Sequence, residues 1–303
     1  MADPIRVGRF GNGQCITHHG ELFQGALRRD ACITPCLVSL PRHDAVSNCR
    51  LELFAAQALE VVPGWKWKAL RAARLTLERC GLQDATGRLT LTSHVDPGLG
   101  LGSSTADVVA AVRAVADITR EHLSADDVAA IAVDAEMAVD PLMYEHFGLL
   151  FAQRAGKVLE SWGNWYPDYA VFSVNLGAAG ARIDTLSLPP PRYSDFELEE
   201  YDRLVAALSG GFRRQDSAAI AAVASRSAML NQSRVPLLHF AAVAEMVGNT
   251  GALGIQITHS GVMGGVLFDP EDPLLNAKVA ALAAQWRKVG DGVFELFETT
   301  RSV

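Results

Sequence analysis

The sequence predicts a two-domain α+β protein. Its 303 residues are enough for two modest domains. Both halves of the chain mix segments in which apolar residues alternate, as in strands, with segments in which they recur at helical spacing. Between the halves, residues 162–167 carry two tryptophans, a glycine and a proline, which is typical of a linker. We therefore expect one domain over residues 1–165 and a second over residues 166–303.

The composition describes a globular protein with a sizeable core. Hydrophobic residues make up 49% of the chain and charged residues 20%, and the formal net charge is −7. That charge argues against a nucleic-acid or anionic-membrane partner. No stretch has the length of a membrane span or signal peptide, so we expect a cytoplasmic protein. The five cysteines show no Cys-x-x-Cys spacing, which predicts reduced thiols and argues against a cysteine zinc site.

The first fifth of the chain predicts several short strands, at residues 15–17, 32–40 and 50–54. Between the first two lies the polar and apolar mixture of residues 18–25, which we expect to be a connection. A helix is expected over residues 65–80, because its leucines and alanines recur on one face. Its lysines and arginines are interpreted as a solvated face.

A glycine-rich segment lies between a strand expected at residues 88–95 and a helix expected to begin near Ser103. Glycines allow a tight turn and close approach of a ligand. The start of the helix directs unpaired N–H groups and the positive end of its dipole into the turn, which favours an anion. The spacing fits neither the common P-loop nor the dinucleotide fingerprint. The segment therefore predicts a phosphate-binding loop made of Pro97, Gly98, Leu99, Gly100, Leu101, Gly102, Ser103, Ser104 and Thr105.

Two carboxylates mark the end of the next expected helix. A capping box at Ser124 opens it, and we expect it to run through Val139 and to stop before Pro141. Within it, Glu136 and Asp140 are four residues apart and should share a face. Carboxylates near a helix C-terminus oppose the dipole, so this placement needs a functional reason.

The remaining elements alternate strands and helices. Strands are expected at 148–151, 157–161 and 169–175, and a strand, a glycine turn and a second strand at 254–268. Helices are expected around 201–209, 217–230, 236–248 and 273–289, with a last strand at 293–298.

Three segments together resemble the motifs of the GHMP kinases, the family of galactokinase, homoserine kinase and mevalonate kinase. The string Pro-Gly-Leu-Gly-Leu-Gly-Ser-Ser-Thr-Ala of residues 97–106 resembles the second motif, and Gly-Glu-Leu-Phe-Gln-Gly of residues 20–25 resembles the first. The glycine-rich segment of residues 254–268, which contains His-Ser-Gly at residues 259–261, resembles the third motif. The first and third motifs are most similar to those of the L-threonine kinases of cobalamin side-chain synthesis. The order and separation fit the family over nearly the whole chain.

The resemblance implies a fold, a reaction and two cofactors. The fold is a ribosomal-protein-S5-domain-2-like N-terminal domain followed by a ferredoxin-like C-terminal domain. The reaction is transfer of the γ-phosphoryl group of ATP to a hydroxyl of a small molecule, with Mg²⁺, in a monomer or homodimer. The implied catalytic residues are Asp140 as proton acceptor, with Glu136 and Ser104 as Mg²⁺ ligands. The implied acceptor-binding residues are His19, Gly20, Glu21, Asp140, His259, Ser260 and Gly261.

The sequence departs from the family at two places. His18 and His19 stand where many relatives carry Lys or Arg, and Met137 and Val139 depart from the Glu-Pro-Thr-Asp run of the threonine kinases. Three alternatives to L-threonine phosphorylation therefore stay open. The acceptor could be L-serine, homoserine or a sugar. The chain could bind nucleotide as a sensor without turnover, or it could be a phosphorylating decarboxylase.

Overall fold

The computed structural model describes residues 9–29, 32–145, 147–178, 192–259 and 261–299. These residues form a mixed α+β structure, as predicted. The strands are β1 (Arg9–Arg29), β2 (Cys32–Leu53), β3 (Leu59–Val62), β4 (Gly87–Ser93), β5 (Leu149–Ala152), β6 (Lys157–Ser161), β7 (Ala170–Asn175), β8 (Gly254–Ile257), β9 (Met263–Phe268) and β10 (Glu295–Glu298). The helices are α1 (Trp67–Arg79), α2 (Ser103–Thr119), α3 (Ala125–Glu136), α4 (Asp195–Arg214), α5 (Ser217–Asn231), α6 (Phe240–Thr250) and α7 (Leu275–Val289).

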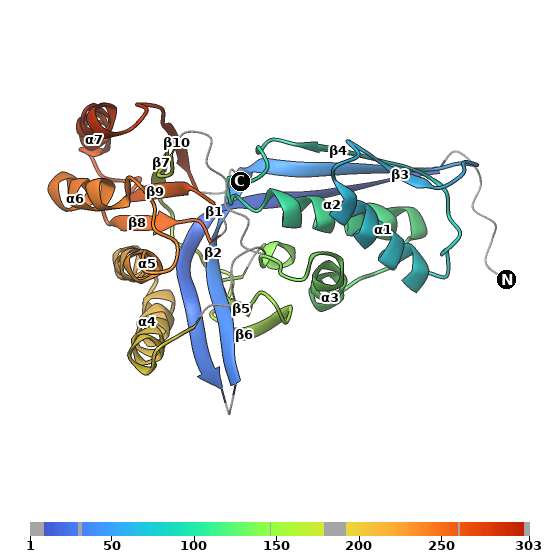
Figure 1. The fold of residues 1–303 in the computed structure, drawn as a ribbon, viewed down its shortest axis with the longest axis horizontal. Helices are drawn as coiled ribbons and strands as arrows, with labels where there is room; N and C mark the ends of the chain where they lie inside the picture. The colour runs from blue at the N-terminus through green and yellow to red at the C-terminus, as the bar shows by residue number, and fades with distance from the viewer. Residues whose placement is uncertain (1–8, 30–31, 146, 179–191, 260, 300–303) are drawn as a thin grey trace.

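One continuous sheet connects the two halves of the molecule. Its strand order is β10-β7-β9-β8-β1-β2-β4-β3, and β5 pairs with β2 while β6 pairs with β5. The long antiparallel strands β1 and β2 extend from the first half of the molecule into the second and bend sharply near the centre of the molecule (Figure 1). The register shifts at Ile16/Thr17, His18/Glu21 and Glu21/Phe23, and such bulges bend a strand. The bend therefore lies at the segment that resembles the first motif.

Helices α1, α2 and α3 cover the first part of the sheet on one side (Figure 1). Helix α2 buries a run of mostly apolar residues from Ala106 to Val115, and it packs against β1, β2 and α1 to form the centre of one hydrophobic core. This burial fixes α2 so that its N-terminus points at the bend of β1, where the peptide N–H of His18 donates to the carbonyl of Leu101 at 3.4 Å.

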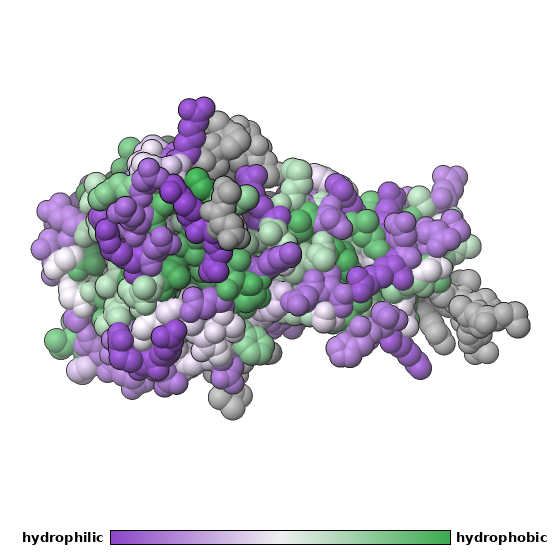
Figure 2. Space-filling view, turned by 90° about the horizontal axis from the view of Figure 1, so that it is seen from below, coloured by the Kyte–Doolittle hydropathy of each residue, from purple (hydrophilic) through white to green (hydrophobic). Residues whose placement is uncertain are grey.

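The second half has its own apolar cores. Helices α4 and α5 pack over the bent ends of β1 and β2, and α6 and α7 pack against the strands β7 to β9. Hydrophilic side chains cover much of one face at both ends of the molecule, with smaller apolar patches between them (Figure 2). Within the described ranges, no helix is both long and apolar enough to span a bilayer.

The structure corrects four local predictions. Residues 18–25 are part of β1 and not a connection, because the bulges let one strand continue through the bend. Helix α3 ends at Glu136, three residues before the predicted end, where Met137 adopts a left-handed φ of 68°. Helix α4 continues through Gly210 and Gly211 to Arg214. The basic face of α1 is not simply solvated, because Lys66 is buried in an ion pair with Asp107 (Nζ–Oδ2 2.6 Å).

Candidate active site

Three glycine-containing segments that are far apart in the sequence meet at one place. A Cβ atom on Gly261 would lie 1.9 Å from the carbonyl oxygen of Leu99, and one on Gly100 would lie 2.7 Å from the peptide nitrogen of Gly261. A Cβ on Gly102 would lie 2.3 Å from the ring of His18. Only glycine allows these backbones to approach so closely. The loop before α2 therefore lies between the bend of β1 and the β8–β9 turn.

The loop that precedes α2 has the geometry of an anion cradle. Gly98, Gly100 and Gly102 have φ values of 83°, 81° and 72°, which side chains rarely allow. Gly102 occupies the N-cap position of α2, where no side chain caps the helix. The N–H groups of the first turn and the positive end of the helix dipole thus face the loop, an arrangement that suits phosphate.

Glu136 lies beside the first turn of α2. The Ser104 hydroxyl donates to one carboxylate oxygen at 2.5 Å, and the Thr105 hydroxyl donates to the other at 2.7 Å. The Lys68 ammonium lies 3.4 Å from the same carboxylate. Burial raises the pKa of Glu136, while the Ser104 hydrogen bond and the charge of Lys68 partly oppose that rise. A hydroxyl and a carboxylate next to a phosphate cradle are the oxygen ligands that Mg²⁺ prefers, so these residues fit a Mg²⁺–nucleotide complex.

Asp140 belongs to a second group of charged side chains, on the other side of Thr105. Its carboxylate lies 3.2 Å from His18 Nε2, and His18 Nδ1 lies 3.6 Å from Glu21. Burial lowers the pKa of His18, but the charges of Asp140 and Glu21 outweigh it and raise the pKa to about 9. His18 is therefore an imidazolium at neutral pH. Although burial acts in the opposite direction, the charge of His18 lowers the pKa of Asp140, which stays ionised.

Glu21 behaves differently from Asp140. Its side chain is fully buried, and burial, opposed by His18 and reinforced by Asp140, raises the pKa to about 7. The Asp140 side chain keeps 22% of its surface exposed. Asp140 is therefore the more accessible of the two carboxylates, and its lowered pKa keeps it ionised.

Thr105 connects the two groups. Its hydroxyl lies 2.7 Å from Glu136 and 3.3 Å from Asp140, and it accepts from the Asp140 peptide N–H at 3.3 Å. Sequence reasoning placed Glu136 and Asp140 on one helix face, but Asp140 lies beyond the end of α3. The chain turns at Met137, and both carboxylates then contact the Thr105 hydroxyl, which places Glu136 and Asp140 close together without a shared helix face.

Among the remaining predicted acceptor-binding residues, His19 lies away from the charged group of Asp140, His18 and Glu21. His19 lies in the core, where its ring nitrogens pair with Ser173 Oγ at 2.7 Å and with Gln256 Nε2 at 2.6 Å. Burial and the nearby Arg42 lower the pKa of His19 to about 3, so it is neutral. Both nitrogens are engaged by these contacts. The His19 side chain thus packs in the core, and its contact with an acceptor stays a prediction.

His259 remains close to the charged group. Its Nδ1 pairs with Gln24 Oε1 at 3.1 Å, and burial lowers its pKa although Asp140 acts to raise it. Gly20 lies in the bulge between His19 and Glu21. Ser260 lies outside the described residues.

Sequence reasoning missed two residues of this site. The sequence left the role of His18 open, and Lys68 was interpreted as part of a solvated face. His18 belongs to the site through its contact with Asp140, and Lys68 through its contact with Glu136. Both contacts join distant segments, so no local sequence pattern shows them. For His18 the available signal was its position directly before the segment that resembles the first motif.

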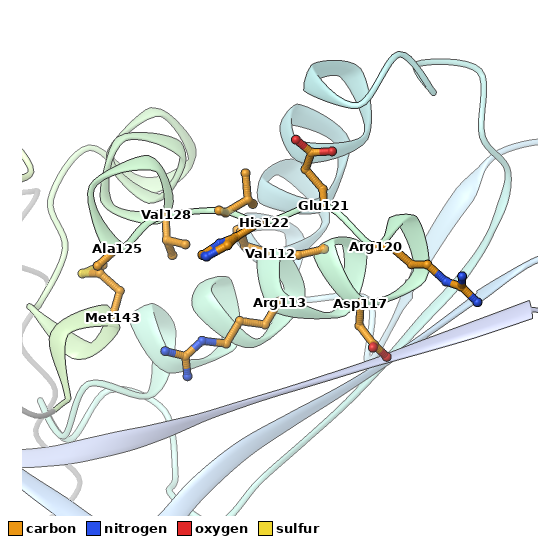
Figure 3. A pocket seen from close by; sticks show the side chains of 11 residues that line it. Val112, Arg113, Asp117, Arg120, Glu121, His122, Ala125, Val128 and Met143 are labelled. Atoms are coloured by element: carbon orange, nitrogen blue, oxygen red, sulfur yellow. The ribbon is translucent and has the colours of Figure 1, made fainter. Parts of the chain in front are cut away.

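A cavity of about 480 Å³ lies elsewhere, along the second half of α2 and the beginning of α3. Arg113, Asp117, His122 and Met143 are among the residues that line it (Figure 3). None of the predicted site residues lines it, so the cavity and the glycine-lined site are separate.

Comparisons with known proteins identify the fold. The family model described as GHMP kinases N terminal domain matches residues 68–144. The structure is similar to homoserine kinase from Cytophaga hutchinsonii, with a TM-score of 0.69 and 15% identity over 96% of this chain and 95% of that chain. The chain has the GHMP kinase fold. Comparison of the sequence with curated proteins finds no significant match.

Two further structures with the same fold are complexes with ligands. The L. major mevalonate kinase in complex with R-mevalonate has a TM-score of 0.65 and 16% identity, with both chains fully covered. MDDEF in complex with MVAPP, AMPPCP and magnesium has a TM-score of 0.64 and 14% identity, covering 96% of this chain and 100% of that chain. The predicted two-domain α+β fold is thus confirmed, and residues 68–144 match the GHMP kinase N-terminal domain.

Proposed function

We propose that this chain is an ATP-dependent kinase that transfers the γ-phosphoryl group to a hydroxyl of a small molecule. The observation that carries the proposal is the continuous contact from the α2 N-terminus through Ser104 and Glu136 to Thr105, and from there to Asp140 and His18. One end of this arrangement suits a phosphate with its cation, and the other suits an alcohol that must lose a proton. The family match and the shared fold support the same reaction.

Each residue then has a stated task. The loop of residues 97–102 and the first turn of α2 bind the phosphates, and Ser104 and Glu136 hold Mg²⁺. When bound, Mg²⁺ neutralises charge that develops on the phosphoryl oxygens. Asp140 orients the acceptor hydroxyl and takes its proton as the new O–P bond forms and ADP leaves. The positive charge of His18 keeps Asp140 ionised for that task.

L-threonine is the proposed acceptor, with O-phospho-L-threonine as the product. The likeness of residues 20–25 and 259–261 to the threonine-kinase motifs supports this choice. Two carboxylates at the acceptor end also favour an acceptor that carries a positive group, such as an amino acid, over an anionic hydroxy acid. L-serine and homoserine share that group and are the next candidates.

A nucleotide-binding sensor on the same fold is the second candidate function. It would need the phosphate cradle but not an ionised, accessible Asp140. The decarboxylase alternative predicts release of CO₂ together with ADP.

The test is ADP release from Mg-ATP with L-threonine, L-serine, homoserine, galactose and mevalonate, each compared with a reaction without acceptor. We expect turnover with L-threonine well above the control. Turnover with another acceptor would support the assignment as a kinase and contradict the assignment of L-threonine as its substrate. ATP binding without ADP release for any acceptor would favour the sensor.

A further inference from the structure

Several buried polar atoms at the acceptor end of the site lack hydrogen bonds. Among the buried side-chain atoms of the described residues, His18 Nδ1, both carboxylate oxygens of Glu21 and Ser39 Oγ have no hydrogen-bond partner. Ser39 lies opposite Glu21 in the β1–β2 register, so these atoms belong to one neighbourhood. The charge of His18, 3.6 Å away, partly compensates Glu21, but leaving a buried carboxylate without a hydrogen bond is still costly. Such a group of atoms in a folded chain points to a ligand.

The geometry specifies the kind of ligand. One ligand atom each of His18, Glu21 and Asp140 lie within 4.8 Å of one another. In a tetrahedral site with metal–ligand bonds of about 2.0–2.1 Å, ligand atoms lie about 3.3 Å apart. His18 Nε2 and Asp140 Oδ2 already lie 3.2 Å apart, whereas Glu21 Oε1 lies 3.6 Å from the other ring nitrogen, Nδ1, so the His18 ring or the Glu21 side chain moves when both carboxylates and one nitrogen bind the same ion. We propose that these three side chains bind a divalent transition-metal ion of the zinc class, with water as the fourth ligand on the exposed side of Asp140.

The chemistry of the three side chains distinguishes this site from the Mg²⁺ site. Mg²⁺ prefers oxygen ligands, whereas an imidazole with carboxylates suits zinc, iron or manganese. The two carboxylates balance the charge of a divalent ion, and the ion replaces the proton that His18 carries at neutral pH. Glu136 is already engaged by Ser104, Thr105 and Lys68, and it does not belong to this group.

The proposed ion has a consequence for the site. Asp140 cannot hold a transition-metal ion and accept the proton of an alcohol at the same time. Zinc is therefore expected to compete with the acceptor and not with ATP. This consequence rests on the proposed kinase function, but the binding of the ion does not.

The test measures zinc binding to the chelator-treated protein without ATP or acceptor. Titration with zinc chloride against a chromophoric chelator should give one bound ion, and Co²⁺ should give the strong visible absorption of a four-coordinate site. His18→Asn and Glu21→Gln should each weaken zinc binding at least about 100-fold. Glu136→Gln should leave it unchanged, as should Cys32→Ser, which removes an exposed thiol that could bind zinc. Circular dichroism checks that each variant folds.

Three results would overturn the proposal. One is the absence of stoichiometric zinc binding to the wild-type chain. A second is binding that survives His18→Asn and Glu21→Gln, and a third is binding lost in Glu136→Gln or Cys32→Ser. If a site variant does not fold, anomalous diffraction from wild-type crystals soaked in zinc places the ion directly. An ion bound at any other residues contradicts the proposal, whatever the kinase assays show.

Discussion

Replacing Gly261 with alanine should damage the active site through contact alone. The new Cβ would lie 1.9 Å from the Leu99 carbonyl oxygen and 2.2 Å from its carbonyl carbon, whereas Cβ contacts under 3.0 Å essentially do not occur. The atoms in the way are backbone, so the two loops must separate by about 1 Å. A misplacement of that size can lower activity about 100-fold. Forcing extra volume into a packed contact also destabilises a fold by about 1–3 kcal/mol.

The assay compares Gly261→Ala with the matched variant Gly248→Ala. A Cβ on Gly248, within helix α6, would meet nothing within 4 Å, so this variant should be neutral or slightly stabilised. Each protein is characterised by its denaturation midpoint in urea and by kcat/KM for Mg-ATP with the best acceptor. We expect a large loss of kcat/KM and some loss of stability for Gly261→Ala only. Equal behaviour of the two variants would show that the loops do not form the proposed contact.

Four further outcomes are expected. Asp140→Asn should lower kcat at least about 100-fold, because it removes the proton acceptor, while nucleotide affinity measured by calorimetry stays nearly constant. Ser104→Ala should raise the Mg²⁺ concentration needed for half-maximal activity; an unchanged Mg²⁺ dependence would exclude Ser104 as a ligand. Lys66→Met should cost about 3–5 kcal/mol in urea unfolding because it leaves Asp107 buried without its cation, and adding Asp107→Asn should recover part of that loss. Because the pKa of His18 is raised from 6.5 to about 9, the contribution of its charge to the unfolding free energy is complete below pH 6.5 and is lost as the pH rises through 9. The unfolding free energy of the wild-type chain should therefore decline over that window. An equally steep decline in His18→Asn would contradict the pairing with Asp140.

The sequence predicted well the features that depend on neighbours in the chain. The glycine turn and the start of α2 follow from the glycine spacing and the apolar run after it, and both lie where expected. The capping box at Ser124 is present with both of its hydrogen bonds. Most strands and helices of the second half also lie within a few residues of their predicted bounds. Local propensity is sufficient for these elements because each one is stabilised by its own backbone and periodic apolar face.

The features that sequence reasoning missed depend on contacts between distant segments. Residues 18–25 contain two glycines and mixed polarity, which locally favours a turn, but pairing with β2 through three register shifts keeps them in a strand. Lys66 is a surface residue by composition, yet Asp107 on another helix makes its burial possible. His18 and Asp140 are 122 positions apart in the sequence. Their pairing depends on the bend of β1 and the reversal at Met137, which no local pattern encodes.

The most direct measurement is mass-spectrometric detection of the phosphorylated acceptor after incubation of the protein with Mg-ATP and L-threonine. The wild-type chain should form O-phospho-L-threonine in amounts equal to the ADP released. Asp140→Asn should form at least about 100-fold less while still binding ATP. Equal product from both proteins would remove Asp140 from the mechanism. ADP release without any phosphorylated acceptor would contradict the assignment of the chain as a small-molecule kinase.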